Sequence, residues 1–383
     1  MNNLIHSSPF KKGLQIFLAV LLGMAVLGNG VAQASGSCVS PTGAGHCFKS
    51  IQAAVDAAND GDQITIRPGK YVEQVTIVGK SLSLVGRHGA VIQAPEAMED
   101  TLSPVTPPED PQEGRPIILV AEAEVTLRDL VIDGRNSAAN NPFLYGIAFI
   151  NADGLIRSNV VKNIGFGEPT VIIIDDEPSF QGEAIFVVNF GATPRTVTIA
   201  QNHVFNYNSS GITVFAQAFP EDPTLGSLNT YIVNNTVIGS GSNEALGQWG
   251  IFIGGYNFAQ ITGTVKDNRI QDLITVDQYP SPGVGIATHD LTYVEIANNT
   301  IENANMGLSI SGMAQVLENR FKKMDIGVLL LVEFPDFGSA IGTVLEDNRF
   351  ENVPMDVLTG PPMMFEAAAK SASEPVQPKR LPR

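Results

Sequence analysis

The sequence predicts an all-β solenoid, a single-stranded right-handed parallel β-helix with a capping helix at its N-terminal end. Two short sequence motifs support this prediction because both repeat along the chain: apolar-x-x-Asn-x-apolar, and Gly followed by alternating apolar residues. The tightest copies fix the unit, since Asn299 to Asn319 and Gly307 to Gly327 are each 20 residues apart. No helical periodicity separates the copies, so each repeat corresponds to one coil of short strands.

The Asn motif predicts a column of side-chain amides at a tight turn between two sheets. Asn tolerates left-handed backbone angles, and its amide can bond the coils on either side, so we interpret the column as structural. Its members are Asn159, Asn202, Asn235, Asn268, Asn299, Asn319 and Asn348, with Asp129 in a degenerate first copy. The apolar residues after them form an expected inward column: Val131, Val161, Val204, Val237, Ile270, Ile301, Phe321 and Phe350.

The Gly motif predicts a second column of inward-facing apolar side chains in another sheet, because side chains alternate between the two faces of a strand. Its members are Ile147, Ile185, Ile212, Ile251, Ile286, Leu308 and Val328. Stacking of like residues at about 4.8 Å would bury an apolar side that no single coil can bury alone.

Residues 1–34 are predicted to be a secretory signal peptide. Lys11 and Lys12 precede the apolar run 13–28, and Ala32-Gln33-Ala34 is a small-x-small cleavage pattern. The run is shorter than a membrane span requires, so we expect no membrane span and a secreted or periplasmic mature chain.

Residues 35–62 are predicted to form an N-terminal cap. Cys38 and Cys47 flank a short loop, and in an oxidising compartment this spacing indicates a disulfide. The alternative is a metal site, for which only His46 is nearby.

Apolar residues recur at helical spacing over residues 50–59, with Ser50 as N-cap and Gly61 beyond the end, and predict an amphipathic helix. We expect this helix to cover the open edge of the first coil. The β-helix is expected over 63–360, and the polar tail 361–383 is expected to be disordered.

The formal net charge of −16 argues against nucleic acid as a partner, because binding to phosphate requires clustered Lys and Arg. A polyanionic sugar is compatible with this charge if a local cationic patch or a bound Ca²⁺ offsets the repulsion. We expect a monomer whose partner is an extracellular polysaccharide or another glycan.

The segment from Phe48 to Arg87 is similar to the opening of pectin-lyase-like β-helix proteins, and the Asn repeats resemble the repeats of that superfamily. Together they span residues 48–358. The resemblance implies the fold and a carbohydrate-related function, since the superfamily includes pectate lyases, pectin methylesterases, polygalacturonases, alginate lyases and mannuronan epimerases. It does not select one chemistry.

Individual family motifs are incomplete. Polygalacturonases carry Asn-Thr-Asp, Asp-Asp and Gly-His-Gly; this sequence has Asp175-Asp176 and a partial Asn151-Ala152-Asp153 but no Gly-His-Gly. Mannuronan epimerases carry Tyr-Gly-Phe-Asp-Pro-His. The segment around His289 keeps the Gly and the His but lacks the Tyr and the first Asp.

Outward positions after each Gly predict an apolar face that includes Phe186, Phe215 and Phe252, which we take as candidate substrate-binding residues. Long insertions border the same sheet at 168–182, 217–228, 240–248 and 274–283, and they would wall a groove. The alternative is that these loops simply cover the apolar patch.

Two candidate chemical groups border this groove. His289, followed by Asp290, has the composition of a general base or acid, with a hydrogen-bonded surface histidine as the alternative. Asp175, Asp176 and Glu177 offer oxygen ligands for Ca²⁺, with a solvated acidic loop as the alternative.

On another sheet, Arg269, Arg320 and Arg349 are predicted to share an outward column, with Thr300 between the first two. Arg269 and Arg320 are candidate substrate-binding residues, because guanidinium groups at coil spacing suit uronate carboxylates. Acids two residues before each Arg favour the alternative of a charge-compensated surface. The Pro-rich insertion 95–115 carries no assignable chemistry.

The leading functional hypothesis is a secreted carbohydrate-active protein that binds an acidic polysaccharide and cleaves or epimerises it by proton abstraction beside a uronate carboxylate. The alternative is a non-catalytic extracellular or cell-surface scaffold that binds glycan or protein.

Overall fold

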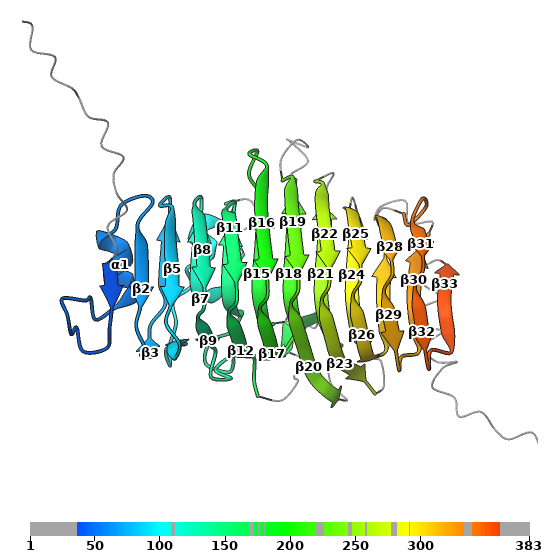
Figure 1. The fold of residues 1–383 in the computed structure, drawn as a ribbon, viewed down its shortest axis with the longest axis horizontal. Coiled ribbons are helices and arrows are strands. Elements are labelled where there is room, and N and C mark those ends of the chain that lie inside the picture. Colours follow the sequence, from blue (N-terminus) through cyan, green and yellow to red (C-terminus); the bar gives the residue numbers. More distant parts are fainter. Residues whose placement is uncertain are drawn as a thin grey trace, which may run out of the picture. The chain divides into compact units, whose positions relative to one another are not determined.

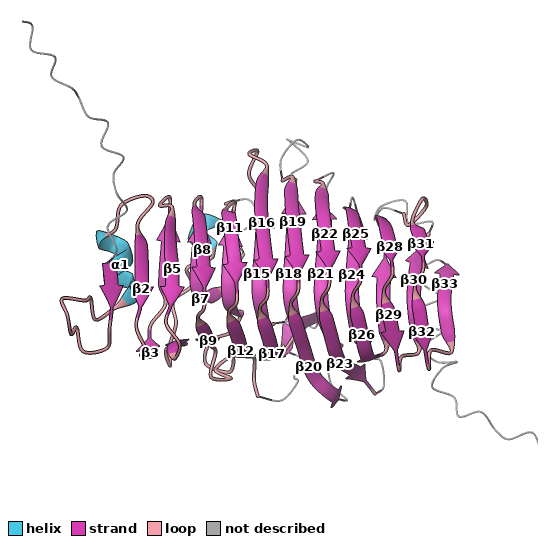
Figure 2. Cartoon of the chain, in the orientation of Figure 1, coloured by secondary structure: helices cyan, strands magenta, loops and turns pink. Residues whose placement is uncertain are grey.

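The computed structural model describes residues 37–108, 112–167, 172–174, 177–179, 181–218, 226–243, 247–256, 259–276, 282–290, 292–332 and 339–360. The predicted signal peptide and the predicted tail lie outside these residues. Three parallel sheets contain nearly all of the described strands (Figures 1 and 2).

We name the three sheets A, B and C. Sheet A consists of β1 (Ser37–Val39), β2 (Gln63–Ile66), β5 (Leu82–Gly86), β8 (Glu124–Arg128), β11 (Asp153–Arg157), β16 (Arg195–Ala200), β19 (Leu228–Val233), β22 (Ile261–Lys266), β25 (Thr292–Ala297), β28 (Met313–Leu317) and β31 (Val344–Glu346). Sheet B consists of β3 (Gly69–Val72), β6 (Ala90–Gln93), β9 (Val131–Asp133), β12 (Val160–Ile164), β17 (His203–Tyr207), β20 (Thr236–Asn243), β23 (Arg269–Thr275), β26 (Thr300–Ala304), β29 (Arg320–Lys322) and β32 (Arg349–Glu351).

Sheet C consists of β4 (Val75–Val78), β7 (Arg115–Ala121), β10 (Leu144–Ile150), β15 (Glu183–Asn189), β18 (Ser210–Gln217), β21 (Trp249–Tyr256), β24 (Val284–Asp290), β27 (Met306–Ile310), β30 (Ile326–Leu331) and β33 (Met355–Gly360). Outside the three sheets, β13 (Ile172–Ile174) and β14 (Glu177–Ser179) form an antiparallel pair, and η1 (Ser103–Val105) is a 3₁₀ turn.

The chain visits the sheets in the order A, B, C and then returns to A, so each coil adds one strand to every sheet. Each strand pairs in parallel with the strand of the preceding coil, as β10 does with β7 and β15 does with β10. This is the predicted right-handed parallel β-helix, and its apolar interior lies between the three sheets.

The second predicted inward column is confirmed. Ile147, Ile185 and Ile212 are register partners in neighbouring strands of sheet C, and the pairing continues through Ile251, Ile286, Leu308 and Val328. All seven side chains are fully buried.

The first column is confirmed from Val161 onward but was wrong at its start. Val161 pairs with Ile132, and Val131 pairs with Val160 on the outward side. The error arose because Leu130, not Asp129, occupies the Asn position in that coil: the backbone N–H of Leu130 donates to Oδ1 of Asn159 at 3.1 Å.

The Asn column forms a continuous hydrogen-bond ladder at the turn between sheets A and B. Nδ2 of Asn235 donates to the Ile199 carbonyl of the preceding coil at 2.8 Å and to Oδ1 of Asn268 in the next coil at 3.0 Å, while its Oδ1 accepts from the backbone N–H of Asn202 at 2.9 Å. The structural interpretation holds, but the conformation predicted for these residues was wrong. The left-handed angles belong to the residue before each Asn: Ser158, Gln201, Asn234, Asp267, Asn298, Glu318 and Asp347.

The N-terminal cap contains the predicted disulfide and the predicted helix. Cys38 and Cys47 are joined, and α1 (Ile51–Ala57) is shorter than the predicted 50–59. Ser50 is the N-cap, and its Oγ accepts from the backbone N–H of Ala53 at 3.2 Å. The carboxylate of Glu73 also accepts from two N–H groups at the start of the helix, a cap that the sequence did not indicate.

The ladder predicts an unequal response to two equivalent substitutions. Asn235→Ala leaves the Ile199 carbonyl and the Asn202 N–H buried without partners, so we expect a loss of about 2–4 kcal/mol in the free energy of unfolding, measured by chemical denaturation. Asn348→Ala removes the same group where it is only partly buried, so its loss should be clearly smaller. Equal losses would contradict a burial-dependent ladder.

Candidate functional site

The outward face of sheet C carries three rows of side chains in register. The first row, before each Gly, is Pro116, Tyr145, Glu183, Ser210, Trp249, Val284, Met306, Ile326 and Met355. The second is Leu119, Ala148, Phe186, Thr213, Phe252, Ala287, Ser309, Leu329 and Leu358. The third is Ala121, Ile150, Val188, Phe215, Gly254 and His289.

Much of this face is buried. The side chains form two apolar clusters separate from the interior of the β-helix, one around Phe186 and one around Phe252. Phe186 is 6% exposed and Phe252 is 7% exposed. Of the insertions that we predicted to wall a groove, residues 168–171, 175–176, 180, 219–225, 244–246 and 277–281 lie outside the described residues.

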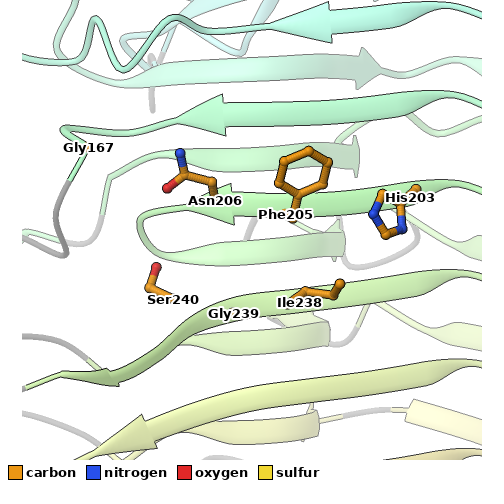
Figure 3. Close-up of a pocket in the computed structure, with 7 residues that line it drawn as sticks. All are labelled: Gly167, His203, Phe205, Asn206, Ile238, Gly239 and Ser240. Atoms are coloured by element: carbon orange, nitrogen blue, oxygen red, sulfur yellow. The ribbon is translucent and has the colours of Figure 1, made fainter.

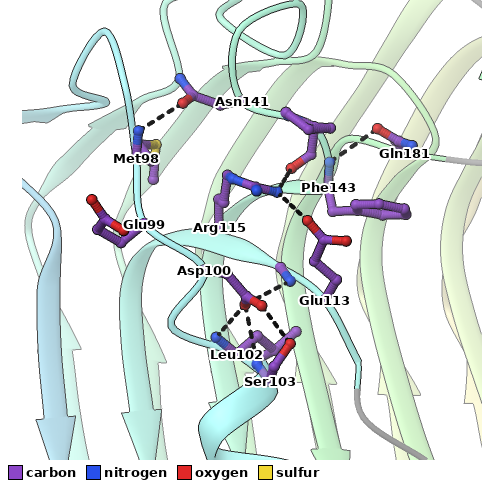
Figure 4. Close-up of polar contacts among 12 residues, drawn as sticks. Met98, Glu99, Asp100, Leu102, Ser103, Glu113, Arg115, Asn141, Phe143 and Gln181 are labelled. Atoms are coloured by element: carbon purple, nitrogen blue, oxygen red, sulfur yellow. Dashed lines mark hydrogen bonds and ion pairs between the residues drawn. The ribbon is translucent and has the colours of Figure 1, made fainter.

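One covering segment is described, and it is the insertion to which the sequence assigned no chemistry. Leu102 is fully buried in the first cluster, and Val105 packs beside it. Oδ1 of Asp100 holds this segment by accepting from the backbone N–H groups of Leu102, Ser103 and Gly114 at 3.0–3.1 Å (Figure 4). Burial alone would raise the pKa of Asp100, but the hydrogen bond from the Ser103 hydroxyl and those from the three backbone N–H groups keep it below its ordinary value. Residues of the insertion 95–115 therefore cover part of the first cluster. Whether the insertions at 168–182, 217–228, 240–248 and 274–283 wall a groove or cover the patch stays a prediction.

A continuous run of aromatic rings crosses four strands of sheet C: β10, β15, β18 and β21. Ring centroids of Phe186 lie 5.0 Å from Tyr145 and 6.0 Å from Phe215. Phe215 lies 5.2 Å from Phe252, which stacks on Trp249 at 4.8 Å. Tyr145, Phe215 and Trp249 are half-buried, so part of the run faces solvent.

Gly254 allows this convergence of rings. A Cβ atom at that position would lie 3.0 Å from a ring atom of Phe252, 3.0 Å from one of Tyr256 and 3.1 Å from one of Phe215. Any side chain there would push the rings apart.

Glu183 is the one acidic residue in the three rows, and its environment is unusual. The side chain as a whole is half-buried, but its Oε2 atom is fully buried without a hydrogen-bond partner. Burial raises the pKa of Glu183 to about 7. The hydroxyl of Thr213 lies near enough to oppose part of this rise, yet its Oγ1 atom is also buried without a hydrogen-bond partner, so the two groups are not in hydrogen-bonding geometry.

Tyr145 is the register partner of Glu183 in the preceding coil. Burial raises the pKa of its hydroxyl, and the nearby carboxyl groups of Glu183 and Asp100 raise it further. Tyr145 therefore stays protonated, and its hydroxyl remains a hydrogen-bond donor.

His289 lies in the third row of the same face, half-buried, with its ring stacked 5.2 Å from that of Tyr256 and 6.4 Å from that of Phe252. Asp290 ends β24, but its side chain lies outside the described residues, as do Asp175, Asp176 and the side chain of Glu177. Among the described residues, no three His, Cys, Asp or Glu side chains gather closely enough to hold a metal ion.

The arginine column lies on sheet B, apart from the aromatic run. Arg269, Thr300, Arg320 and Arg349 are consecutive register partners, as predicted. Their acidic partners are not the acids that precede them in sequence: Arg320 is bonded to Glu351, and Arg269 lies 3.9 Å from Glu302. A polar groove of about 700 Å³ runs beside Thr300, Arg320 and Arg349.

A smaller hollow of about 330 Å³ lies elsewhere on sheet B, lined by His203, Phe205, Ile238 and their neighbours (Figure 3). The rings of His203 and Phe205 are 5.1 Å apart. The sequence analysis did not single out this hollow.

Sequence reasoning missed Glu183, Tyr145 and Trp249 because it counted outward positions only after each Gly. The residue before the Gly also faces outward, and in the coil of Glu183 the Gly itself is replaced by Ala184. The available signal was a single acidic residue in a column that is otherwise uncharged.

The coil geometry is that of a right-handed parallel β-helix. Similar solved structures include a pectin methylesterase from Erwinia chrysanthemi (12% identity, 90% of this chain, 98% of that chain, TM-score 0.35). A lacto-N-biosidase from Eubacterium ramulus is also similar (13% identity, 86% of this chain, 67% of that chain, TM-score 0.40).

The A-module of a mannuronan C-5 epimerase from Azotobacter vinelandii is a third (13% identity, 82% of this chain, 93% of that chain, TM-score 0.29). At such identities the likeness concerns the fold alone. No protein-family model matches the chain, and no curated protein matches it.

The raised pKa of Glu183 predicts that stability falls as pH rises. The unfolded carboxyl loses its proton near 4.5 and the folded one near 7, so between these values the folded state binds more protons and rising pH favours unfolding. Thermal unfolding from about pH 5 to about pH 8 should show a loss on the order of 3 kcal/mol from this group.

Glu183→Gln should flatten that pH dependence, whereas Glu295→Gln on sheet A should not. Burial also raises the pKa of Asp325, but its contribution is common to all three proteins. An unchanged pH profile in Glu183→Gln would contradict the assignment.

Proposed function

We propose that this protein is exported and binds an extracellular glycan along the outward face of sheet C. The observation that carries the proposal is the aromatic run from Tyr145 to Tyr256, whose rings lie 4.8–6.0 Å apart. Sugar rings pack their C–H faces against aromatic side chains while their hydroxyl groups bond at the edge, and rings that combine apolar area with a polar tip suit such a ligand.

The spacing of the rings favours an extended chain over a single sugar. The half-buried rings of Tyr145, Phe215 and Trp249 lie on β10, β18 and β21, so a ligand that contacts all three must reach across several strands about 4.8 Å apart. A solenoid face of this kind suits a polymer.

The charge of the face favours an uncharged glycan. The three rows contain no Lys or Arg, and their one acidic side chain, Glu183, would repel a uronate once ionised. For this face, binding of a neutral chain is therefore better supported than the lyase or epimerase chemistry suggested by the sequence.

Export is supported by the disulfide between Cys38 and Cys47, a bond that persists in oxidising compartments. No helix among the described residues has the length and hydropathy that crossing a membrane requires. The cleaved signal peptide and the monomeric state remain predictions.

Trp249 provides the direct test. It is half-buried and stacks on Phe252, so Trp249→Ala should weaken binding of neutral hexasaccharides (β-glucan, xylan and mannan series) about tenfold or more, as measured by calorimetry. Tyr231→Ala, which removes a 41% exposed ring from sheet A, is the matched control and should bind as the wild type does. If both variants bind alike, sheet C is not the glycan-binding face.

A second candidate function is uronate binding at the groove beside Arg320 and Arg349. Its support is the volume of that groove and the two guanidinium groups one coil apart. Because His289 lies on sheet C, the arginines and the proposed base are on different sheets, so we propose binding here and no cleavage. A Ca²⁺ site at Asp175, Asp176 and Glu177 is a separate proposal.

Oligogalacturonate titration would decide this second candidate. Arg349→Ala should reduce the affinity for oligogalacturonate about fivefold or more and leave neutral hexasaccharides unaffected, because only the uronate offers a carboxylate. Arg128→Ala, an exposed arginine paired with Asp129 on sheet A, controls for the loss of one positive charge. Equal losses in both variants would indicate only general electrostatics.

A further inference from the structure

We infer that Glu183, Thr213 and Tyr145 form a polar subsite on the outward face of sheet C that binds a hydroxyl group of an uncharged sugar. This inference rests on the proposed glycan-binding function of that face. It adds the class of sugar and the side chains that recognise it.

Two polar atoms of this subsite are unsatisfied. Oε2 of Glu183 and Oγ1 of Thr213 are both buried, and neither has a hydrogen-bond partner among the described residues. A buried polar atom without a partner costs on the order of 1–3 kcal/mol, so native proteins rarely keep one without use. Thr213 is only 2% exposed, which makes the polar group part of a built surface and not a solvated edge.

The fold does not need a carboxyl group at position 183. The same row in other coils carries Ser210, Val284, Met306 and Ile326, which pack well without any acid. An apolar side chain at 183 would join the adjacent cluster around Phe186 and remove the burial cost.

The three side chains are chemically complementary to a sugar hydroxyl. A protonated carboxyl, a threonine hydroxyl and a tyrosine hydroxyl can each donate and accept a hydrogen bond, as a sugar hydroxyl can. The ring of Tyr145 is itself half-buried, so an apolar surface for the C–H face of the sugar adjoins the polar atoms. A uronate carboxylate in the same place would meet Glu183 as a like charge.

Few of the described groups near Glu183 would produce the same pH dependence as its carboxyl group. From β10 the neighbouring group is Tyr145, which stays protonated, and from β18 the neighbours are Ser210 and Thr213, which do not titrate. Asp100, in the segment before β7, remains ionised because its hydrogen bonds lower its pKa. Among the described residues of this face, His289 lies three strands away in sheet C, and His289→Gln serves as its control.

The experiment uses the full chain and the hexasaccharide that the wild type binds best. Glu183→Met should raise the unfolding temperature at about pH 8, because it removes a buried charge, and should weaken binding about tenfold. Glu183→Gln should also be more stable at that pH but lose less than about threefold in affinity at about pH 6, since an amide still donates and accepts. The affinity of the wild type should fall about tenfold from about pH 6 to about pH 8. This pH dependence should be absent in Glu183→Gln and present in His289→Gln and Glu295→Gln.

Each outcome has a distinct meaning. If Trp249→Ala weakens binding but Glu183→Met binds as the wild type does, the face binds glycans and this subsite is refuted. If Glu183→Met is less stable than the wild type at about pH 8, the carboxyl is structural and the inference also fails. If the wild type binds none of the neutral hexasaccharides, both the subsite and the proposed function of the face are overturned.

Discussion

Each coil of this protein can bury its apolar side chains because the coils on either side present similar side chains in the same register. The columns through Ile185 and Val237 are the direct expression of this constraint. The Asn ladder enforces it at the turn between sheets A and B, since each amide bonds both neighbouring coils and tolerates no slip of one residue. Interior packing and turn hydrogen bonding therefore specify the same alignment.

Because the interior is complete without the outer surface of sheet C, that surface is free to carry other chemistry. It holds two apolar clusters outside the β-helix, and Leu102 covers part of the first. The rings from Tyr145 to Tyr256 converge where Gly254 leaves room. Glu183 is placed there at a cost to stability, in a position where other coils have uncharged residues.

The repeated part of the structure was predictable because a period of two residues within a strand and one Asn per coil are both local signals. The first copy was placed one residue off because Leu130 stands where other coils have Asn. The site was harder to predict, since Glu183 precedes Ala184 and not the expected Gly, and its burial depends on segments distant in sequence. The folding of residues 95–108 onto sheet C has no periodic signature at all, because a few contacts such as Leu102 hold it there.

The strict correspondence between successive coils also affects how such a surface can evolve. A duplication that inserts one complete coil keeps every column and every amide in step, whereas an insertion of a few residues within a strand disrupts all of them. The aromatic run can therefore become longer or shorter by whole strands without a change to the interior. Under the proposed function, specificity for longer or shorter polymers would be accessible through gene duplication, independently of changes to individual contact residues.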